Sequence, residues 1–250
     1  MGPHGCIQRR SGAGVPIFWW LVLATVPSPG TASVAPDDAY PAVLATYTTT
    51  LIGSLPSRTD NIRLAAQALY GITLDTGEVL SFNAAVGPRT VERGYQQAPV
   101  ILHEMRDVQI GGGICQAAST LLDAALLAGL AVAERHRHSF PVDYVPPAHD
   151  ATIVWGAKDL RIVNVLDQRV RIRATVLGST LTVRVEGEQE SREAFELETE
   201  VVEASMGTIT DNQGRQIDLY RVRTVDGMEV DRELIHRDVY PPALVRSSER

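Results

Sequence analysis

The 250-residue chain has only two cysteines, Cys6 and Cys115, which is too few for a fold held together by disulfides. Basic residues are also in deficit, since 23 Lys and Arg stand against 30 Asp and Glu, for a formal net charge of -7. This balance argues against a nucleic-acid-binding protein. With 44% hydrophobic and 21% charged residues, the chain has the composition of a globular protein, which fits neither disorder nor a coiled coil.

The apolar stretch near the start of the chain is short for a membrane span. It covers Val15–Val26, 12 residues, whereas a spanning helix needs roughly 20. Arg9 and Arg10 precede it, and small residues ending at Ala35 follow, which is the arrangement of a cleaved export signal. We therefore expect a signal peptide over 1–35, with an uncleaved anchor as the alternative. The mature protein is predicted to be secreted or in the cell envelope, with no stable membrane span.

Hydrophobic periodicity predicts an α+β fold with early helices packed on a later antiparallel sheet. Helices are expected over 61–69, capped by Thr59 or Asp60, and over 117–130, ending near Gly129. Alternating or β-branched stretches predict short strands at 42–52, 78–84, 100–103, 140–145, 151–155, 160–165, 169–176 and 180–185.

The composition divides the mature chain into three segments. The α+β domain is expected over 36–187. Residues 188–203, with seven glutamates and one arginine, indicate an acidic linker or an exposed strand. Residues 204–250 recover an alternating pattern and are interpreted as a small β module.

Cleavage of the signal would leave Cys115 as the single thiol, either buried and inert or kept for its reactivity. Gly111, Gly112 and Gly113 lead into it and place it at the start of a helix, where backbone N–H groups favour the thiolate. The glycines would let a substrate approach closely, and Gln116 or nearby N–H groups could stabilise an oxyanion. The alternative is a flexible entry to a buried helix.

A thiol nucleophile needs an imidazole to take its proton and an acid to orient that imidazole. We expect His138 to be this base, with Asp150 as its partner, because His138 precedes the strand expected from Phe140. His136 and Asp159 are the second choices for the two roles. Cysteine on a helix, then histidine and aspartate on successive strands, would meet at one edge of the sheet.

The same residues permit other interpretations. His136 and His138, with Cys115, His149 or Asp150, could hold zinc, although one thiolate after three glycines is not a usual zinc motif and HExxH is absent. We therefore predict neither a metal nor another cofactor. The histidines could also be solvated loop residues.

A second group of candidate site residues lies upstream, in a turn-rich loop. Arg89, Arg93 and Tyr95 could bind substrate there, since two arginines can hold a carboxylate or phosphate in fork geometry. A solvated loop is the alternative. If Cys115 were buried, this loop would instead indicate a non-catalytic module that binds the cell wall.

Several motifs between residues 58 and 187 together resemble the VanW-like family. They are Ser81-Phe82-Asn83, Val86-Gly87-Pro88-Arg89-Thr90, Arg93-Gly94-Tyr95, Gly111-Gly112-Gly113-Ile114-Cys115-Gln116, Ser119-Thr120-Leu121, Glu134-Arg135-His136, His138-Ser139, Tyr144-Val145-Pro146, Asp150-Ala151-Thr152, Asp159-Leu160 and Asn164. The sequence departs from the family pattern at Ala117-Ala118 and at Pro147-Ala148-His149. The resemblance implies an association with vancomycin resistance. It also implies that the binding partner is peptidoglycan or its peptide precursors.

The order of cysteine-headed helix, histidine and aspartate also looks like the core of transglutaminase-like and papain-like enzymes. We therefore expect a secreted cell-envelope enzyme of cysteine-dependent acyl transfer or amide hydrolysis on peptidoglycan peptides. A non-catalytic wall-binding module and a zinc-binding variant of the same site are the alternatives.

Overall fold

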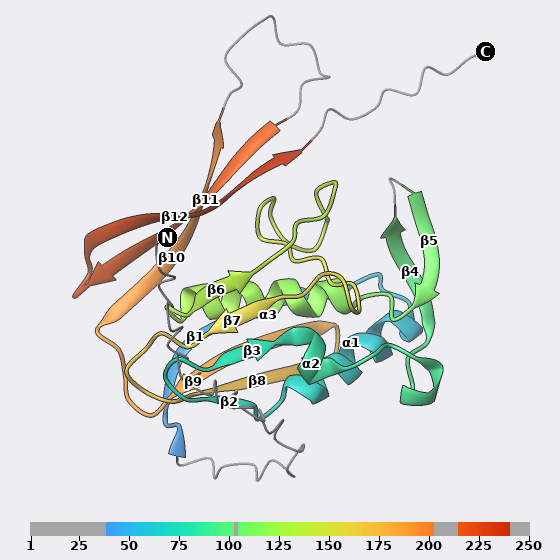
Figure 1. Ribbon diagram of the computed structural model, residues 1–250, viewed down its shortest axis with the longest axis horizontal. Helices are drawn as coiled ribbons and strands as arrows, with labels where there is room; N and C mark the ends of the chain where they lie inside the picture. The colour runs from blue at the N-terminus through green and yellow to red at the C-terminus, as the bar shows by residue number, and fades with distance from the viewer. Residues whose placement is uncertain (1–38, 103–104, 203–214, 241–250) are drawn as a thin grey trace, which may run out of the picture. The chain divides into compact units, whose positions relative to one another are not determined.

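The computed structural model describes residues 39–102, 105–202 and 215–240 (Figure 1). The expected signal peptide, 1–35, and Cys6 lie outside the described residues. None of the helices in the described ranges is long and apolar enough to cross a bilayer. Helices and antiparallel sheets both occur, so the expected α+β class is confirmed.

The helices lie in the first half of the chain and the longest strands at its end. In chain order the elements are β1 (Ala42–Thr50), α1 (Pro56–Leu69), β2 (Thr73–Leu74), β3 (Val79–Ser81), α2 (Phe82–Val86), the 3-10 helix η2 (Val91–Arg93), β4 (Gln97–Leu102), β5 (Met105–Ile110), α3 (Ile114–Leu127), β6 (Ala131–Glu134), β7 (Arg161–Val163), β8 (Val170–Leu177), β9 (Thr180–Gly187), β10 (Glu193–Val202), β11 (Arg215–Val225) and β12 (Met228–Tyr240).

The main sheet has the antiparallel order β1-β9-β8-β2. Alternate residues of its strands enter the core, as Ile172 and Val183 do, both fully buried. Helix α3 packs on β1 and β9, and α1 packs on β8 and on α3 (Figure 1). A smaller sheet, β3-β7-β6, contacts α3 through β6. Covered from several sides, α3 forms the centre of the core.

The glycines around α3 set where this helix begins and ends. Gly113 is its N-cap, with a left-handed φ of 104° that side chains rarely tolerate. Beyond its other end, Gly129 has a φ of 83°, and a Cβ there would lie 2.6 Å from the Phe195 ring of β10. The expected termination near Gly129 is confirmed, while the helix begins at Ile114, three residues earlier than the apolar pattern alone predicted.

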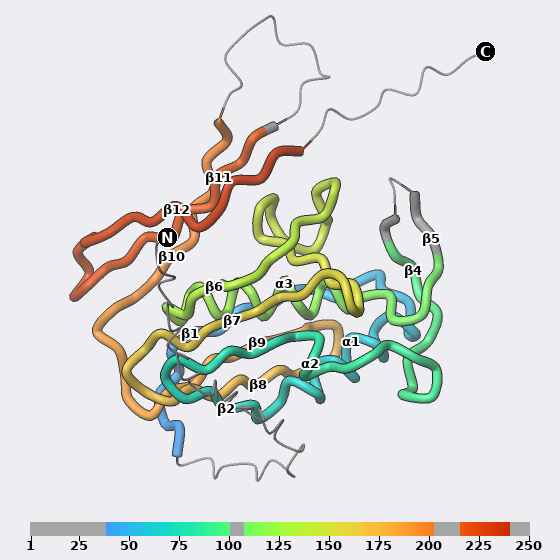
Figure 2. The backbone as a smooth tube through the Cα atoms, in the orientation of Figure 1, coloured from blue at the N-terminus to red at the C-terminus, as the bar shows by residue number. Residues whose placement is uncertain are grey.

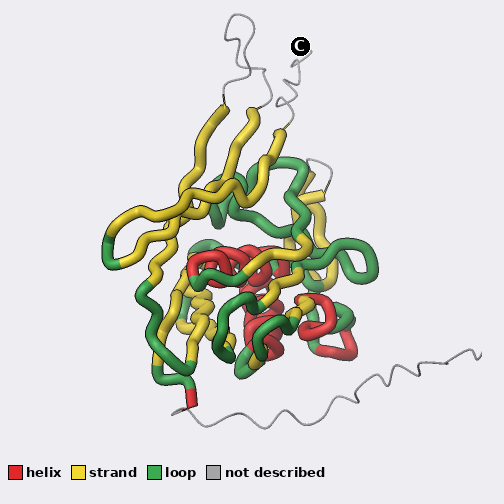
Figure 3. Tube along the Cα trace, turned by 60° about the vertical axis from the view of Figure 1, so that its left-hand side comes forward, coloured by secondary structure: helices red, strands yellow, loops and turns green. Residues whose placement is uncertain are grey.

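Strands β10, β11 and β12 form a separate antiparallel sheet, drawn in yellow in the upper part of Figure 3. The acidic segment thus contains a strand, β10, whose glutamates alternate with the less exposed Phe195 and Leu197. Ile217, Leu219 and Tyr240 of this sheet belong to the same buried cluster as α3. The C-terminal strands therefore share a core with the preceding domain.

Two predicted elements in the first part of the chain have other bounds in the structure. Helix α1 begins at Pro56, not after Thr59 or Asp60, because proline is favoured in the first helical turn, where its missing N–H costs nothing. The strand expected over 78–84 ends at Ser81, whose hydroxyl accepts the Ala84 N–H and starts the short helix α2. The strands expected at 42–52 and 100–103 correspond to β1 and β4.

The strands expected at 140–145 and 151–155 are wrong, because this part of the chain is a long loop between β6 and β7 (Figure 2). Its backbone binds other groups in place of a neighbouring strand. The Ala151 N–H donates to Ser119 Oγ at 2.9 Å, and the Thr152 N–H donates to the His136 carbonyl at 2.6 Å. The loop therefore runs along the start of α3. The strands expected at 160–165, 169–176 and 180–185 are confirmed as β7, β8 and β9.

Candidate active site

Cys115 is the second residue of α3, and its side chain is partly buried. The Ile153 N–H points at the sulfur, with the nitrogen 3.5 Å from Sγ, and the Ile153 carbonyl oxygen is 3.9 Å from it. The loop that follows Asp150 thus lies against the thiol. A backbone N–H aimed at sulfur favours the anionic form over the neutral one.

His138 and Asp150 form a close pair beside this thiol. Nδ1 of His138 donates to Oδ2 of Asp150 at 2.6 Å, and the backbone N–H of His138 donates to the same oxygen at 2.6 Å. The carboxylate therefore holds both the ring and the main chain of the histidine. Because Nδ1 is engaged, Nε2 is the nitrogen left to interact with Cys115.

The three side chains shift one another's proton affinities. Burial raises the pKa of Cys115. This effect is outweighed by the hydrogen bond and charge of His138, by the Ile153 N–H and by the charge of Arg89, so the pKa lies below its ordinary value. Burial lowers the pKa of His138, yet Asp150 and Cys115 outweigh this and raise it to about 9. Both shifts favour a thiolate facing an imidazolium over the neutral pair.

Asp150 is kept ionised despite being 1% exposed. Burial raises the pKa of this carboxyl, but the hydrogen bond to His138 and the charge of Arg135 bring it below its usual value. Nη2 of Arg135 donates to Oδ1 of Asp150 at 3.0 Å, and Tyr240 Oη donates to the same oxygen at 3.2 Å. Both carboxylate oxygens are thus occupied by donors.

Arg89 is the residue of the upstream loop that the structure brings toward the sulfur. Its guanidinium donates to Asn83 Oδ1 at 2.8 Å and to the Gly87 carbonyl at 2.9 Å, and it lies 5.6 Å from the centre of the Trp155 ring. Held by these contacts, its charge acts on Cys115. A fixed cation beside the thiol is a suitable partner for an anionic group.

The other two residues of that loop have structural contacts. Arg93 is exposed and donates to the Val86 carbonyl at 2.9 Å. Its guanidinium packs against Gly87, where an added Cβ would lie 2.8 Å from Nη2. Tyr95 is 3% exposed and belongs to the hydrophobic core. Tyr95 is therefore no surface contact for a ligand, because its ring is packed in the core, whereas the exposed Arg93 stays a predicted ligand-binding residue beside Arg89.

The three glycines before Cys115 face other parts of the chain. A Cβ at Gly112 would lie 2.5 Å from the Ala98 carbonyl oxygen of β4, and one at Gly113 would lie 2.9 Å from Ile62 of α1. A Cβ at Gly111 would lie 2.8 Å from Cβ of Arg89. These positions are glycine because the backbone of this turn is packed against its neighbours, so the expectation that they leave room for substrate is not retained.

Gln116 was expected to stabilise an oxyanion, but its side chain lies in the core. Nε2 donates to Thr49 Oγ1 at 3.0 Å and to the Thr50 carbonyl at 2.9 Å, and the residue is 1% exposed. Successive positions on a helix point about 100° apart, so Gln116 faces β1 when Cys115 faces the loop. We therefore withdraw Gln116 as an oxyanion donor.

The second choices for base and orienting acid have other partners. Nε2 of His136 lies 2.9 Å from Glu134 Oε1. Asp159 accepts the Asn83 N–H at 2.8 Å and also binds the Ser81 hydroxyl, so it holds the start of α2. Neither His136 nor Asp159 interacts with Cys115 or His138 in these contacts. The histidine and aspartate that were expected on successive strands lie instead in the connection between β6 and β7.

The zinc alternative requires several of these imidazoles to converge, which they do not. His138 binds Asp150, His136 binds Glu134, and Nδ1 of the buried His149 lies 3.1 Å from both carboxylate oxygens of Asp123. Across 39–102, 105–202 and 215–240, no three His, Cys, Asp or Glu side chains are grouped as a set of metal ligands.

Residues that sequence reasoning missed complete the site. Ser119 and Ile153 bind the loop to α3, Arg135 and Tyr240 bind Asp150, and Asp238 binds Arg135. Arg135 stands within the Glu134-Arg135-His136 motif and could have been suspected from it. Tyr240 lies 90 residues after Asp150, and no local pattern links the two.

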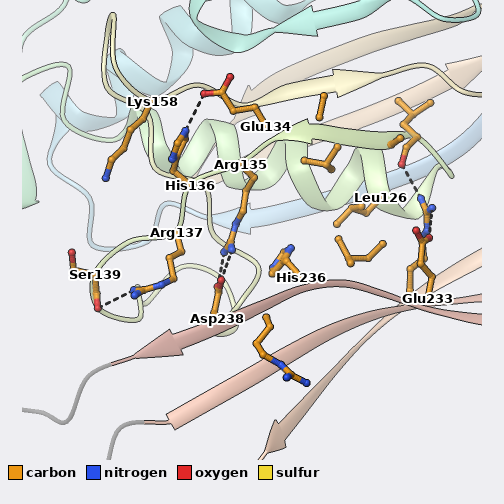
Figure 4. A pocket seen from close by; sticks show the side chains of 17 residues that line it. Leu126, Glu134, Arg135, His136, Arg137, Ser139, Lys158, Glu233, His236 and Asp238 are labelled. Atoms are coloured by element: carbon orange, nitrogen blue, oxygen red, sulfur yellow. Dashed lines mark hydrogen bonds and ion pairs between the residues drawn. The ribbon is translucent and has the colours of Figure 1, made fainter.

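A pocket of about 700 Å³ lies beside Arg135 and Asp238, which help to hold Asp150 (Figure 4). The segment from Ala131 to Arg137 lines one side, and residues of β11 and β12, among them His236 and Asp238, line another. Neither Cys115 nor His138 is among its lining residues. The pocket therefore borders the contacts that hold Asp150 and not the sulfur itself.

Comparison with known proteins places these residues in a family. The family model described as VanW like protein matches residues 57–186, just over half of the chain. The uncharacterized protein YoaR of Bacillus subtilis (strain 168) is 41% identical over 140 residues, covering 56% of this chain and 46% of YoaR. The chain thus spans less than half the length of that relative. No solved structure matches, so the likeness to transglutaminase-like and papain-like enzymes stays a prediction. The chain belongs to the VanW-like family.

Proposed function

We propose that this protein is an exported, cell-envelope enzyme that uses Cys115 for acyl transfer or amide hydrolysis on peptidoglycan peptides. The observation that carries the proposal is the contact of a helix-start thiol with an imidazole that is itself oriented by a buried carboxylate. Nucleophile, base and orienting acid in this relation are the minimal set for covalent catalysis on an acyl group. Membership of the VanW-like family supports the cell envelope as the place of action.

In the proposed first step the Cys115 thiolate attacks the amide carbonyl carbon, forming a C–S bond while the C=O π electrons move to oxygen. The oxyanion collapses, the C–N bond breaks, and Nε2–H of His138 protonates the departing amine. The resulting thioester reacts with water or with an amine, and His138 accepts the proton of that nucleophile. Asp150 orients the ring throughout and stabilises its charged form.

An oxyanion donor is available from the backbone. The first N–H groups of a helix have no partner within it, and those of Ile114 and Gln116 bind the carbonyls of Gly111 and Gly113. We assign the remaining donor role to the N–H of Cys115, since the side chain of Gln116 is directed to β1. Arg89 is the group we expect to bind a carboxylate of the peptide.

The test is incubation of purified peptidoglycan and its soluble stem peptides with the wild-type chain, followed by mass spectrometry. We expect Cys115-dependent cleavage or exchange of an amide bond, abolished in both Cys115→Ala and Cys115→Ser. Full activity of Cys115→Ala would refute the proposal. If the wild-type chain and Cys115→Ala bind peptidoglycan equally and neither alters it, the protein is a wall-binding module.

A further inference from the structure

The end of strand β12 reaches the candidate active site from the C-terminal sheet. Tyr240, 3% exposed, donates from Oη to Oδ1 of Asp150 at 3.2 Å and accepts the Ala148 N–H at 3.1 Å. His236 of the same strand donates from Nε2 to the Ala148 carbonyl at 2.7 Å. Both backbone groups of Ala148, two residues before the carboxylate, are therefore held by β12.

Arg135 connects the same strand to Asp150 by a second route. Its Nη1 and Nη2 atoms donate to the two carboxylate oxygens of Asp238 at 2.6 and 2.8 Å (Figure 4). Nη2 also donates to Oδ1 of Asp150, and Nε donates to the Asp150 carbonyl at 2.7 Å. The guanidinium plane is thus fixed by Asp238 on one side and by Asp150 on the other.

The charges in this cluster are buried and balanced. The side chains of Arg135, Asp150 and Asp238 are 7%, 1% and 5% exposed, and His138 supplies the second positive charge. A buried ionic network is stable only when each member keeps its partners. Removing a donor from β12 would therefore alter how Asp150 is held, with consequences for His138.

We propose that strand β12 is part of the candidate active site and that Tyr240 and Asp238 are positioning residues, which act on Asp150 directly and through Arg135. Oδ2 of Asp150 binds His138, so the rotation of the carboxylate is set by what binds Oδ1, namely Arg135 and Tyr240. The C-terminal sheet thereby completes the site. The sequence does not indicate this role, because β12 and Asp150 are far apart along the chain. This inference rests on the proposed function of Cys115.

The experiment measures how fast iodoacetamide alkylates Cys115 in the full chain between pH 5.5 and 10. Mass spectrometry of the Cys115 peptide excludes any signal from Cys6. In Tyr240→Phe, which keeps the ring beside Arg137, a freer carboxylate holds the imidazolium less well. We expect at least a threefold slower reaction at pH 6.5 and an unchanged rate at pH 10. Arg135→Lys, which keeps the charge without the fork, should show a larger effect in the same direction.

Tyr220→Phe on β11, in the same sheet but beside Arg232, is the matched control and should leave the profile unchanged. A Tyr240→Phe profile that superimposes on that of the wild type would overturn the positioning role while leaving the proposed function intact. If Arg135→Lys does not fold, Tyr240→Phe alone decides. A wild-type Cys115 that titrates as it does in the urea-unfolded chain would overturn the proposed function and this inference together.

Discussion

Ser119 lies one helical turn after Cys115, and its Oγ accepts the Ala151 N–H at 2.9 Å. The same hydroxyl donates to the Cys115 carbonyl at 2.8 Å. Because Ala151 directly follows Asp150, one buried side chain links the helix that carries the sulfur to the loop that carries the carboxylate. The spacing between nucleophile and acid therefore depends on a residue that takes no part in the proposed chemistry.

Replacing Ser119 with Ala should lower the free energy of unfolding by about 1–2 kcal/mol, since the Ala151 N–H is left buried without its acceptor. Urea denaturation measures this change. Ser179→Ala, at an exposed turn between β8 and β9, is the control and should change stability by less than about 0.5 kcal/mol. Equal midpoints for Ser119→Ala and the control would contradict the linking role.

His138→Gln should slow alkylation of Cys115 at pH 6.5 by at least about tenfold, because the thiolate loses its main stabilising partner. The rate at pH 10, where any thiol is ionised, should stay close to that of the wild type. His136→Gln is the matched control, as His136 binds Glu134. A similar loss in both variants would show that the effect is not specific to His138.

Turnover on a peptidoglycan peptide should follow a bell-shaped dependence on pH. The pKa of Cys115 is lowered, so the rising limb lies below the range of an ordinary thiol. The pKa of His138 is raised to about 9, so its proton is retained until then and the falling limb lies near pH 9. Steady-state rates from pH 5 to 10 test this. Activity that keeps rising above pH 10 would exclude protonated His138 as the acid.

His236 should make the protein sensitive to acid. Burial and the charge of Arg135 lower its pKa to about 4, so its contribution to stability is present above the unfolded pKa of about 6.5 and is lost as pH falls toward 4. The loss of stability amounts to about 2 kcal/mol between pH 7 and 5. His236→Gln keeps an N–H donor for Ala148 without titrating. Urea denaturation at pH 7 and 5 should show a smaller acid loss in the variant, and identical losses would contradict the prediction.

Gly112→Ala should destabilise the protein by at least about 2 kcal/mol, because its Cβ would lie 2.5 Å from the Ala98 carbonyl oxygen, a backbone atom that cannot easily move. Gly156→Ala is the control. Its φ of 76° makes alanine unfavourable there, but nothing lies within 4 Å of the added Cβ, so about 1 kcal/mol is expected. Urea midpoints compare the two, and a larger loss in Gly156→Ala would disprove close packing as the reason for Gly112.

Local patterns predicted the elements whose stability depends on near neighbours in sequence. The Ala- and Leu-rich stretch of α3 and the alternating strands β8 and β9 follow directly from hydrophobic periodicity. The loop at 140–155 was mistaken for strands because its apolar residues also alternate. Its backbone partners are Ser119 and Cys115 on α3 and His136 much earlier in the same connection, and periodicity carries no information about such distant contacts.

The amino-acid sequence by itself determined that a thiol follows a glycine turn at the head of a helix, and that histidines and aspartates follow it in the order of the family. Only the tertiary structure decided which of them meet: His138 and Asp150 pair beside Cys115, while Gln116 turns to β1 and Asp159 holds α2. It also brought Tyr240 to Asp150 from 90 residues away. The physical reason is that side-chain direction and charge pairing are set by packing between elements distant in sequence, which no local spacing records.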